Sequence, residues 1–322
     1  MRKGNSLAIG IFFALCVGVG LFLWTQNSTP LSPENPGRFA QYDLATDTTL
    51  ASINLNDVLS GGVRKDGIPA ITDPVFLPLA ETDVRESARG ILVQHNGMSR
   101  FYPYSILVWH EIVNDTLDDL SIAVTYCPLC DSALVFDRLV QGTLLQFGVS
   151  GLLFESNLLM YDTATESLWS QSNRRSVVGT YTGTELSLVP FQVLRLSEVR
   201  EKYPTTEVLS TDTGYARNYG DTPYDGYTDT EQTLFPISIT DKRFPAKDIF
   251  YVIPFRGRSL AARYHDISEG TTSFSVDSFA ITITRDGDEI VAQHGNELLP
   301  GYFELWFSWA VHHQDDGVVL RQ

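Results

Sequence analysis

The sequence is poor in sulfur and in positive charge. Of its 322 residues, three are cysteines and three are methionines, and 23 Lys and Arg stand against 39 Asp and Glu. The net charge of −16 leaves no basic surplus to displace counterions from a phosphate backbone, so no nucleic acid is expected as a partner. Cys16 lies in an N-terminal apolar segment, so thiol chemistry of the folded body can use only Cys127 and Cys130.

Several motifs that would give this cysteine pair a known task are missing. Asp131 follows Cys130, so there is no C-x-x-C-H and covalent c-type haem is excluded at the pair. No second C-x-x-C is present to complete a four-ligand zinc site, and residues 148–151 lack the G-x-S-x-G pattern of a nucleophile elbow. The pair then has three uses: a local disulfide, a dithiol redox couple, or half of a soft-metal site.

Residues 1–24 are expected to form a transmembrane anchor or a signal segment. Arg2 and Lys3 precede an uncharged run over residues 6–24, and no A-x-A-like cleavage site follows it, which favours an anchor. The positive-inside rule then predicts a single-pass protein of the cell membrane with its body outside the cytoplasm, periplasmic or extracellular. The Pro-containing residues 25–40 are typical of a linker.

The body is predicted to be mainly β with a few short helices (α+β). Residues 90–94 and 98–102 flank Asn96-Gly97, a dipeptide that favours a tight hairpin turn. Apolar periodicity predicts helices over residues 104–113 and 196–203. The polar residues 214–233 are interpreted as a loop that divides a CxxC-containing domain, residues 41–213, from a second β unit, residues 234–322.

A weak internal repeat predicts that these two β units are related. Gly97, Ser99 and Tyr104 recur 160 residues later as Gly257, Ser259 and Tyr264, and each set lies in or just after a hairpin pattern. The second unit has no cysteine in the turn that corresponds to the C-x-x-C. If the repeat is real, the fold does not need a cysteine pair at such a turn, which favours a functional role for Cys127 and Cys130.

Four blocks of the sequence resemble the prokaryotic domain-of-unknown-function family 3179. They cover residues 61–70, 102–115, 125–138 and 147–171, and they include Tyr126-Cys127-Pro128-Leu129-Cys130 and Ser167-Leu168-Trp169-Ser170-Gln171. The family has no established activity, so the resemblance implies a set of positions rather than a reaction.

Two of these positions suggest a soft-metal site with the cysteines. The thioether of Met160 and the imidazole of His110 would complete, with two thiolates, a ligand set suited to Cu(I), so copper is the expected cofactor. Glu111 or Asp162 would orient the imidazole from behind. The structural alternatives are that His110 is a packing histidine and Met160 a core residue.

A second set of residues, most of them polar, is predicted either to line a pocket or to stabilise local turns. Trp169 would form a pocket wall and Gln171 a polar anchor, or else both would pack inside. The polar residues placed in this group or around the metal are Glu111, Asn114, Asp115, Asp162, Ser167, Trp169 and Gln171. His312 and His313 near the C-terminus are expected on the solvated surface.

Three hypotheses for function follow. The first is a membrane-anchored extracytoplasmic protein that uses Cys127 and Cys130 for copper binding or for thiol–disulfide redox chemistry. The second is a binding or structural module of the cell envelope with an inert disulfide and a protein partner. The third is an enzyme that works at Trp169 and Gln171 without the thiols. The sequence leaves open whether the protein is an enzyme.

Overall fold

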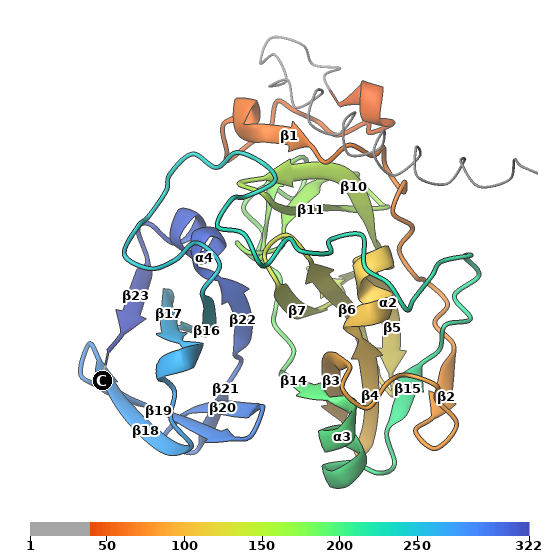
Figure 1. Cartoon of the computed structure of the whole chain (residues 1–322). Coiled ribbons are helices and arrows are strands. Elements are labelled where there is room, and N and C mark those ends of the chain that lie inside the picture. Colours follow the sequence, from red (N-terminus) through yellow and green to blue (C-terminus); the bar gives the residue numbers. More distant parts are fainter. Residues whose placement is uncertain (1–38, 322) are drawn as a thin grey trace, which may run out of the picture.

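The computed structural model describes residues 39–321, which form five larger β-sheets and few helices in a propeller-like arrangement (Figure 1). The helices are α2 (Tyr104–His110), α3 (Leu196–Lys202) and α4 (Trp306–His312), with short 3₁₀ turns η1 (Ala40–Tyr42), η2 (Leu55–Asp57) and η3 (Tyr264–Asp266). Each sheet is named below after one of its strands.

Three sheets come mainly from the first two thirds of the chain. The β10 sheet has the order β1 (Val58–Ser60), β10 (Phe147–Phe154), β11 (Asn157–Asp162), β12 (Leu168–Ser170) and β13 (Arg175–Val178). The β3 sheet has the order β14 (Phe191–Arg195), β3 (Arg89–His95), β4 (Met98–Pro103), β15 (Glu207–Leu209) and β2 (Phe76–Pro78). The β6 sheet is a meander of β5 (Ile112–Leu117), β6 (Leu120–Cys127) and β7 (Ser132–Asp137), followed by the small ribbon β8 (Leu139–Val140) and β9 (Thr143–Leu144).

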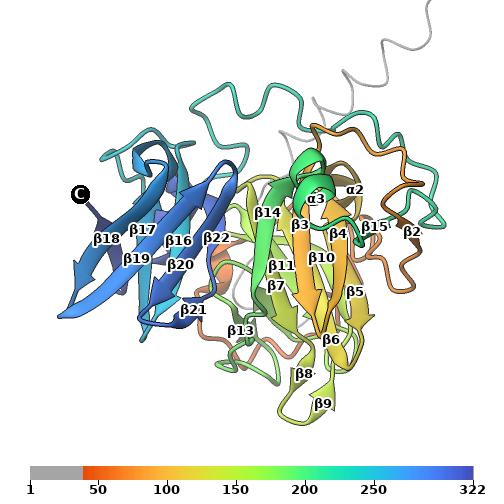
Figure 2. The same ribbon diagram turned by 90° about the horizontal axis from the view of Figure 1, so that it is seen from below.

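The last third of the chain forms two further sheets. The β16 sheet has the order β22 (Tyr302–Leu305), β16 (Ile249–Phe255), β17 (Arg258–Arg263) and β23 (Gly317–Leu320). The β19 sheet is a meander of β18 (Gly270–Val276), β19 (Phe279–Asp286), β20 (Glu289–His294) and β21 (Glu297–Leu299). Seen from below, these two sheets lie together on one side and the β3 sheet lies on the other (Figure 2).

The predicted organisation of the body as two related β units is wrong. The strands form five sheets, and the largest core cluster draws side chains from both parts of the chain, including Met160 and Trp169 from the first and Phe250, Val252 and Trp306 from the second. This shared core joins the two parts of the chain, beside further clusters that each part forms mostly from its own residues.

The predicted anchor over residues 1–24 lies outside the described residues, as does the predicted linker up to residue 38. Within residues 39–321, no helix combines the length and the apolar character that crossing a membrane requires.

Two four-strand modules nevertheless share a strand order. In the β3 sheet the order is β14-β3-β4-β15 and in the β16 sheet it is β22-β16-β17-β23, with an antiparallel hairpin in the middle and a parallel last pair in both. Each hairpin turns through two residues with positive φ, Asn96-Gly97 and Arg256-Gly257. The similarity is limited to these modules, around which the other sheets are differently built.

The helix predicted over residues 104–113 ends earlier than the periodicity indicates. Helix α2 stops at His110 because Glu111 takes a positive φ of 58°, and the chain then enters β5 at Ile112. The helix predicted over residues 196–203 corresponds closely to α3. The early end of α2 places Glu111 at the start of the β6 sheet, beside the cysteine pair.

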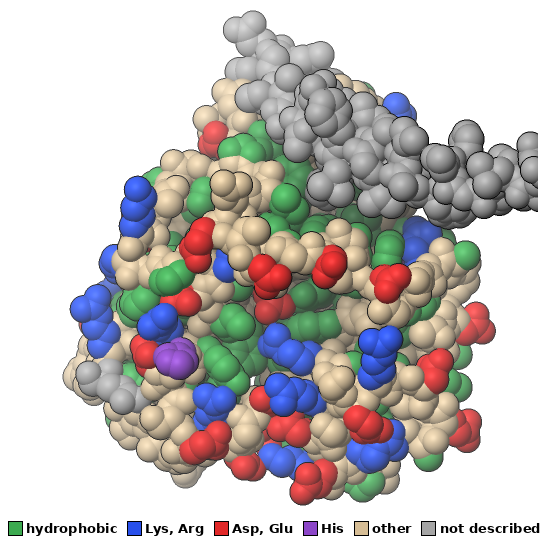
Figure 3. All heavy atoms as spheres, viewed as in Figure 1, with side chains coloured by type: hydrophobic (Ala, Val, Ile, Leu, Met, Phe, Trp, Pro, Cys, Tyr) green, Lys and Arg blue, Asp and Glu red, His purple; other side chains and the backbone are tan. Residues whose placement is uncertain are grey.

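The visible surface mixes charges of both signs. Figure 3 shows Lys and Arg side chains interspersed with Asp and Glu on the face of Figure 1. Several of these charges form ion pairs, such as Arg200 with Glu86 and Lys202 with Asp286.

Candidate functional site

The two cysteines lie in a tight turn between the antiparallel strands β6 and β7. Cys127 ends β6 and pairs with Ser132 at the start of β7, and the backbone N–H of Cys130 donates to the carbonyl of Cys127 at 3.2 Å. Pro128 suits the first corner of such a turn because its ring fixes φ. Asp131 leaves the turn with a positive φ of 43°, and its carboxylate accepts from the Tyr126 hydroxyl at 3.0 Å.

Segments far away in the chain fix this CxxC turn, residues 127–130. The backbone N–H of Leu305 on β22 donates to the carbonyl of Cys130 at 2.9 Å. The hydroxyl of Tyr227 donates to the carbonyl of Leu129 at 3.0 Å. The turn therefore sits where the β6 sheet, the β16 sheet and the segment 214–233 meet, and the polar backbone of a buried loop is satisfied from outside.

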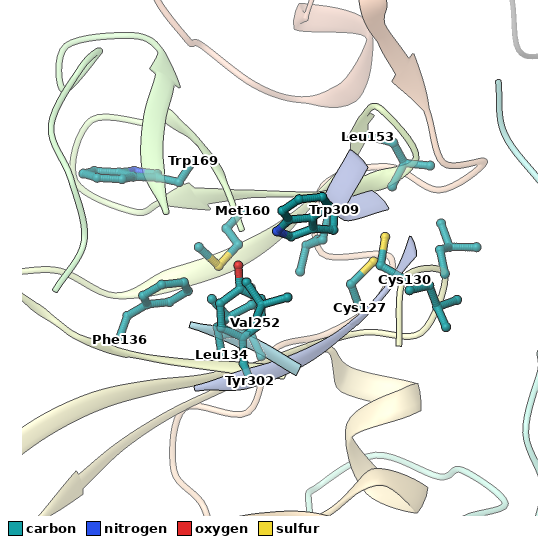
Figure 4. Packing of buried hydrophobic residues seen from close by; sticks show 14 of the residues in the cluster. Cys127, Cys130, Leu134, Phe136, Leu153, Met160, Trp169, Val252, Tyr302 and Trp309 are labelled. Carbon is teal, nitrogen blue, oxygen red and sulfur yellow. The ribbon is translucent and has the colours of Figure 1, made fainter. Parts of the chain in front are cut away.

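Both cysteines are free thiols, and both are almost fully buried. Their sulfurs lie together beside Trp309 (Figure 4), and Cys127 acts directly on the Cys130 side chain. The Cys130 thiol also donates to the Ser156 carbonyl at 3.4 Å and accepts from the Asn157 amide at 3.5 Å. Burial is the main cause that raises the pKa of the Cys130 thiol well above its ordinary value, and Cys127 and the charge of Glu304 raise it further. The thiol form of Cys130 therefore predominates at rest.

Glu111 is a buried carboxyl next to the strand that carries Cys127. Its carbonyl accepts from the Tyr126 N–H at 2.8 Å, and burial raises the pKa of its side chain to about 8. It lines a cavity of about 30 Å³ together with Leu129, Tyr224 and Phe235. Burial and the charges of both Glu111 and Cys127 raise the pKa of Tyr224, which places all three groups at one location. A strained backbone and an uncompensated carboxyl in a cavity mark a candidate site.

The structure does not bring His110 to the thiols. Both of its ring nitrogens already have partners, Nδ1 with the Pro69 carbonyl and Nε2 with the Tyr219 hydroxyl, each at 2.7 Å. The ring packs against Tyr215 and Tyr219, and burial lowers its pKa. His110 has the contacts of a packing histidine.

Met160 and Trp169 belong to the core of the β10 sheet. They face each other across β11 and β12, and the Trp169 ring packs edge-on against Phe147 with centroids 5.7 Å apart. In Figure 4 the Met160 thioether lies apart from the two cysteine sulfurs, with Trp309 between them. The predicted four-ligand set is thus not assembled around the CxxC turn.

Four of the other predicted polar residues hold local structure. Asn114 exchanges two hydrogen bonds of 2.8 Å with the backbone of Phe147, and Asp115 pairs with Arg100 at 2.8 Å and accepts from the Tyr102 hydroxyl at 2.6 Å. Asp162 accepts from the backbone N–H of Thr165 at 2.7 Å and from the Trp169 indole at 2.9 Å. Ser167, close by, is hydrogen-bonded to the Thr165 hydroxyl at 2.7 Å.

Gln171 is the predicted polar residue that does reach the cysteine turn. Its Oε1 accepts from the Ser132 hydroxyl at 2.9 Å and from the Asn157 amide at 3.0 Å, and the same amide contacts the Cys130 sulfur. Its own amide donates to Thr125 Oγ1 at 3.0 Å. All of these groups are buried, so Gln171 is part of the wall behind Cys130 rather than an open ligand anchor.

Sequence reasoning missed a polar group on and after β22. Glu304, Ser308 and His313 are buried, and Glu304 and Ser308 act on Cys130. His313 was expected on the surface but is 6% exposed. The available signal was the aromatic run over residues 306–309, which marks a buried helix but gives no indication that Ser308 faces a thiol.

A family model described as a protein of unknown function (DUF3179) matches residues 65–301. The chain belongs to this family. The resemblance is thereby confirmed over most of the body, including Glu111, Cys127 and Cys130, whereas Glu304, Ser308 and His313 follow the matched region. No curated protein and no solved structure matches the chain. Membership of the DUF3179 family thus defines the domain and leaves its chemistry to be inferred from the site.

Among residues 39–321, one group of three side chains brings possible metal-ligand atoms close to one another. It comprises His95, Asp118 and Asp119 in two neighbouring hairpin turns, and both carboxylates are exposed. No such cluster within the described residues includes Cys127 or Cys130.

Proposed function

We propose that Cys127 and Cys130 form a dithiol–disulfide redox centre in this DUF3179 protein. The observation that carries the proposal is that two free thiols contact each other in a turn fixed from three segments. Buried carboxyls adjoin the pair, and the clusters of His, Cys, Asp and Glu that could hold a metal do not include these thiols within residues 39–321. Dithiol oxidation needs neighbouring sulfurs and groups that exchange protons with them, and the thiols and buried carboxyls here are groups of these kinds.

The co-reactant is a small or protein disulfide. The Cys127 thiolate attacks one sulfur of that disulfide, and the released sulfur leaves with the electron pair and is protonated. Cys130 then forms a bond to the Cys127 sulfur, and the second partner sulfur leaves in the same way. Two electrons and two protons thus pass from the pair to the partner, which becomes two thiols. Such partners are common in the extracytoplasmic compartments that the sequence predicts.

The site is covered in the described structure. Cys127 is 1% exposed and Cys130 is 0% exposed, with Tyr224 and Tyr227 of the segment 214–233 beside them. The ammonium of Lys247 lies 3.4 Å from the centroid of the Tyr227 ring and helps to hold this segment in place. We expect disulfides to react more slowly with the native protein than with an exposed thiol, because the tyrosines must move first.

The test compares thiol content before and after equilibration with glutathione buffers, in a Cys16→Ser background so that only the pair is counted. We expect the native protein to lose two hydrogens, measured by intact mass, with a midpoint potential between roughly −120 and −270 mV. Cys127→Ser and Cys130→Ser, the matched single variants, should form no intramolecular disulfide.

Two results would contradict the proposal. One is a pair that stays reduced in the native state under every buffer. The other is a disulfide that resists reduction below about −300 mV, as structural disulfides do, which would favour the inert envelope module. Copper binding stays an untested prediction, and the existing partners of His110 and the core packing of Met160 do not favour it.

A further inference from the structure

A second buried carboxyl, that of Glu304 on β22, adjoins the CxxC turn. The next residue, Leu305, bonds the Cys130 carbonyl, so the position of β22 relative to Cys130 is fixed by the backbone. The side chain of Glu304 is 0% exposed. Its Oε1 accepts hydrogen bonds from Ser308 at 2.6 Å and from Ser172 at 2.5 Å.

Ser308 connects this carboxyl to the thiol. Ser308 follows Glu304 by four residues, and its hydroxyl acts on the Cys130 side chain, where it opposes the rise in the pKa of the thiol. A hydroxyl has one proton to donate and two lone pairs to accept with. The Ser308 proton points to Glu304, and the Cys130 proton points to the Ser156 carbonyl. Once the Cys130 S–H turns towards Ser308, the Ser308 oxygen can accept its proton, and the three groups then form a continuous proton path.

Other buried polar groups lie near Glu304. The other carboxylate oxygen, Oε2, has no hydrogen-bond partner among residues 39–321, and the same holds for Tyr302 Oη, His313 Nε2 and Arg174 Nε. The charges of His313 and Arg174 both act on Glu304. The other ring nitrogen of His313 pairs at 3.0 Å with Asp316, whose side chain is 38% exposed. The groups facing Glu304 are therefore Cys130, Tyr302, Arg174 and His313, and the last leads to the surface.

We propose that Glu304 takes the proton of Cys130 through Ser308 when Cys130 resolves the mixed disulfide on Cys127. This step rests on the proposed redox function. The thiol proton passes to the Ser308 oxygen while the Ser308 proton passes to Glu304 Oε1. The Cys130 sulfur bonds to the Cys127 sulfur, and the partner sulfur leaves with the electron pair. Burial raises the pKa of Glu304, which brings its proton affinity closer to that of a thiol.

The test isolates the resolving step. The mixed disulfide of Cys127 with 4,4′-dithiodipyridine is formed at acid pH in the Cys16→Ser protein, the pH is then raised rapidly, and release of the second thiopyridone is followed by absorbance. We expect Glu304→Gln and Ser308→Ala to slow this release by about 100-fold at neutral pH. The matched control is Ser172→Ala, which removes a donor from the same oxygen but leaves the path to Cys130 intact, and it should slow release far less.

The pH profile separates a proton path from a structural role. The wild-type rate should show the ionisation of a carboxyl that Glu304→Gln lacks, and at high pH, where Cys130 ionises unaided, the two rates should converge. Equal rates and profiles in wild type and Glu304→Gln would overturn the path while leaving the redox function intact. No second release even in wild type would instead reject the redox function. If Glu304→Gln does not fold, as judged by circular dichroism, Ser308→Ala decides between the outcomes.

Discussion

Glu111 shows how one residue can combine backbone and electrostatic strain. Its positive φ ends α2 and turns the chain into β5, and its side chain is then enclosed without a cationic partner from residues 39–321. A positive φ is costly for a residue with a Cβ, and a buried carboxylate loses its hydration. The neutral carboxylic acid is therefore the form that the folded protein favours up to a pH of about 8.

Stability should consequently fall as pH rises through this range. The pKa of Glu111 is about 8 when folded and near 4.5 when unfolded, so the folded state holds the extra proton between these values. The stabilisation is fully present below pH 4.5 and is lost towards pH 8, by up to about 5 kcal/mol. Urea unfolding between these pH values should show that the free energy of unfolding declines less steeply with pH for Glu111→Gln than for wild type. Glu304 keeps part of the decline in both proteins because burial raises its pKa as well. Identical slopes would mean that Glu111 is already ionised in the fold.

At the scale of elements, a buried amide network joins the β6 and β10 sheets behind the cysteines. Gln171, just after β12, bonds Thr125 on β6, Ser132 on β7 and Asn157 on β11. Each polar group in this network has a partner, so the interface between the two sheets has a defined register. A satisfied buried network contributes more to specificity than an equally buried apolar contact.

We therefore expect Gln171→Ala to destabilise the protein by roughly 3 kcal/mol, because it leaves buried partners without hydrogen bonds. Gln141→Ala provides the control, since Gln141 lies on the exposed turn between β8 and β9 and makes one surface contact with Thr184. Denaturant midpoints of both variants would measure the difference. If Gln171→Ala matched Gln141→Ala, the network would be structurally dispensable.

At the scale of the whole molecule, the C-terminal sheets complete the core on which the CxxC turn rests. Strand β22 contacts β7, and Trp306 and Trp309 lie in the same cluster as Cys127 and Cys130. The segment 214–233 adds Tyr227 to this cluster from a region with no regular structure. The surroundings of Cys127 and Cys130 are thus built by segments from both parts of the described chain rather than by the part that contains the cysteines.

A fragment of residues 41–213 should then fail to fold cooperatively, because the apolar surface that normally contacts Phe250, Trp306 and Trp309 would face water. Thermal unfolding followed by circular dichroism would show a broad, non-cooperative change, whereas residues 39–321 would melt in one sharp transition. A sharp transition of the fragment near the temperature of the longer chain would contradict a shared core. It would also restore the predicted domain division at residue 214.

Much of the local structure was predictable from the sequence because it depends on neighbours in the chain. Asn96-Gly97 favours positive φ at both turn residues, and residues 132–137 contain the short apolar run of the buried strand β7. The end of α2 was not predictable, since apolar periodicity continues to Val113 and Glu111 has no intrinsic preference for a positive φ. Its conformation depends on the bond from Tyr126 across the sheet.

By itself the sequence determined the family, the turn that joins two cysteines and the absence of other thiols in the body. Only the tertiary structure decided which side chains surround that turn. His110 and Met160 lie in family blocks, as the cysteines do, but His110 bonds Tyr219 and Met160 pairs with Trp169. Ser308 and Glu304, by contrast, act on Cys130 although they lie more than 170 residues away in the chain. Sequence pattern reports local spacing, and the environment of a buried thiol is set by contacts between distant strands that local spacing does not encode.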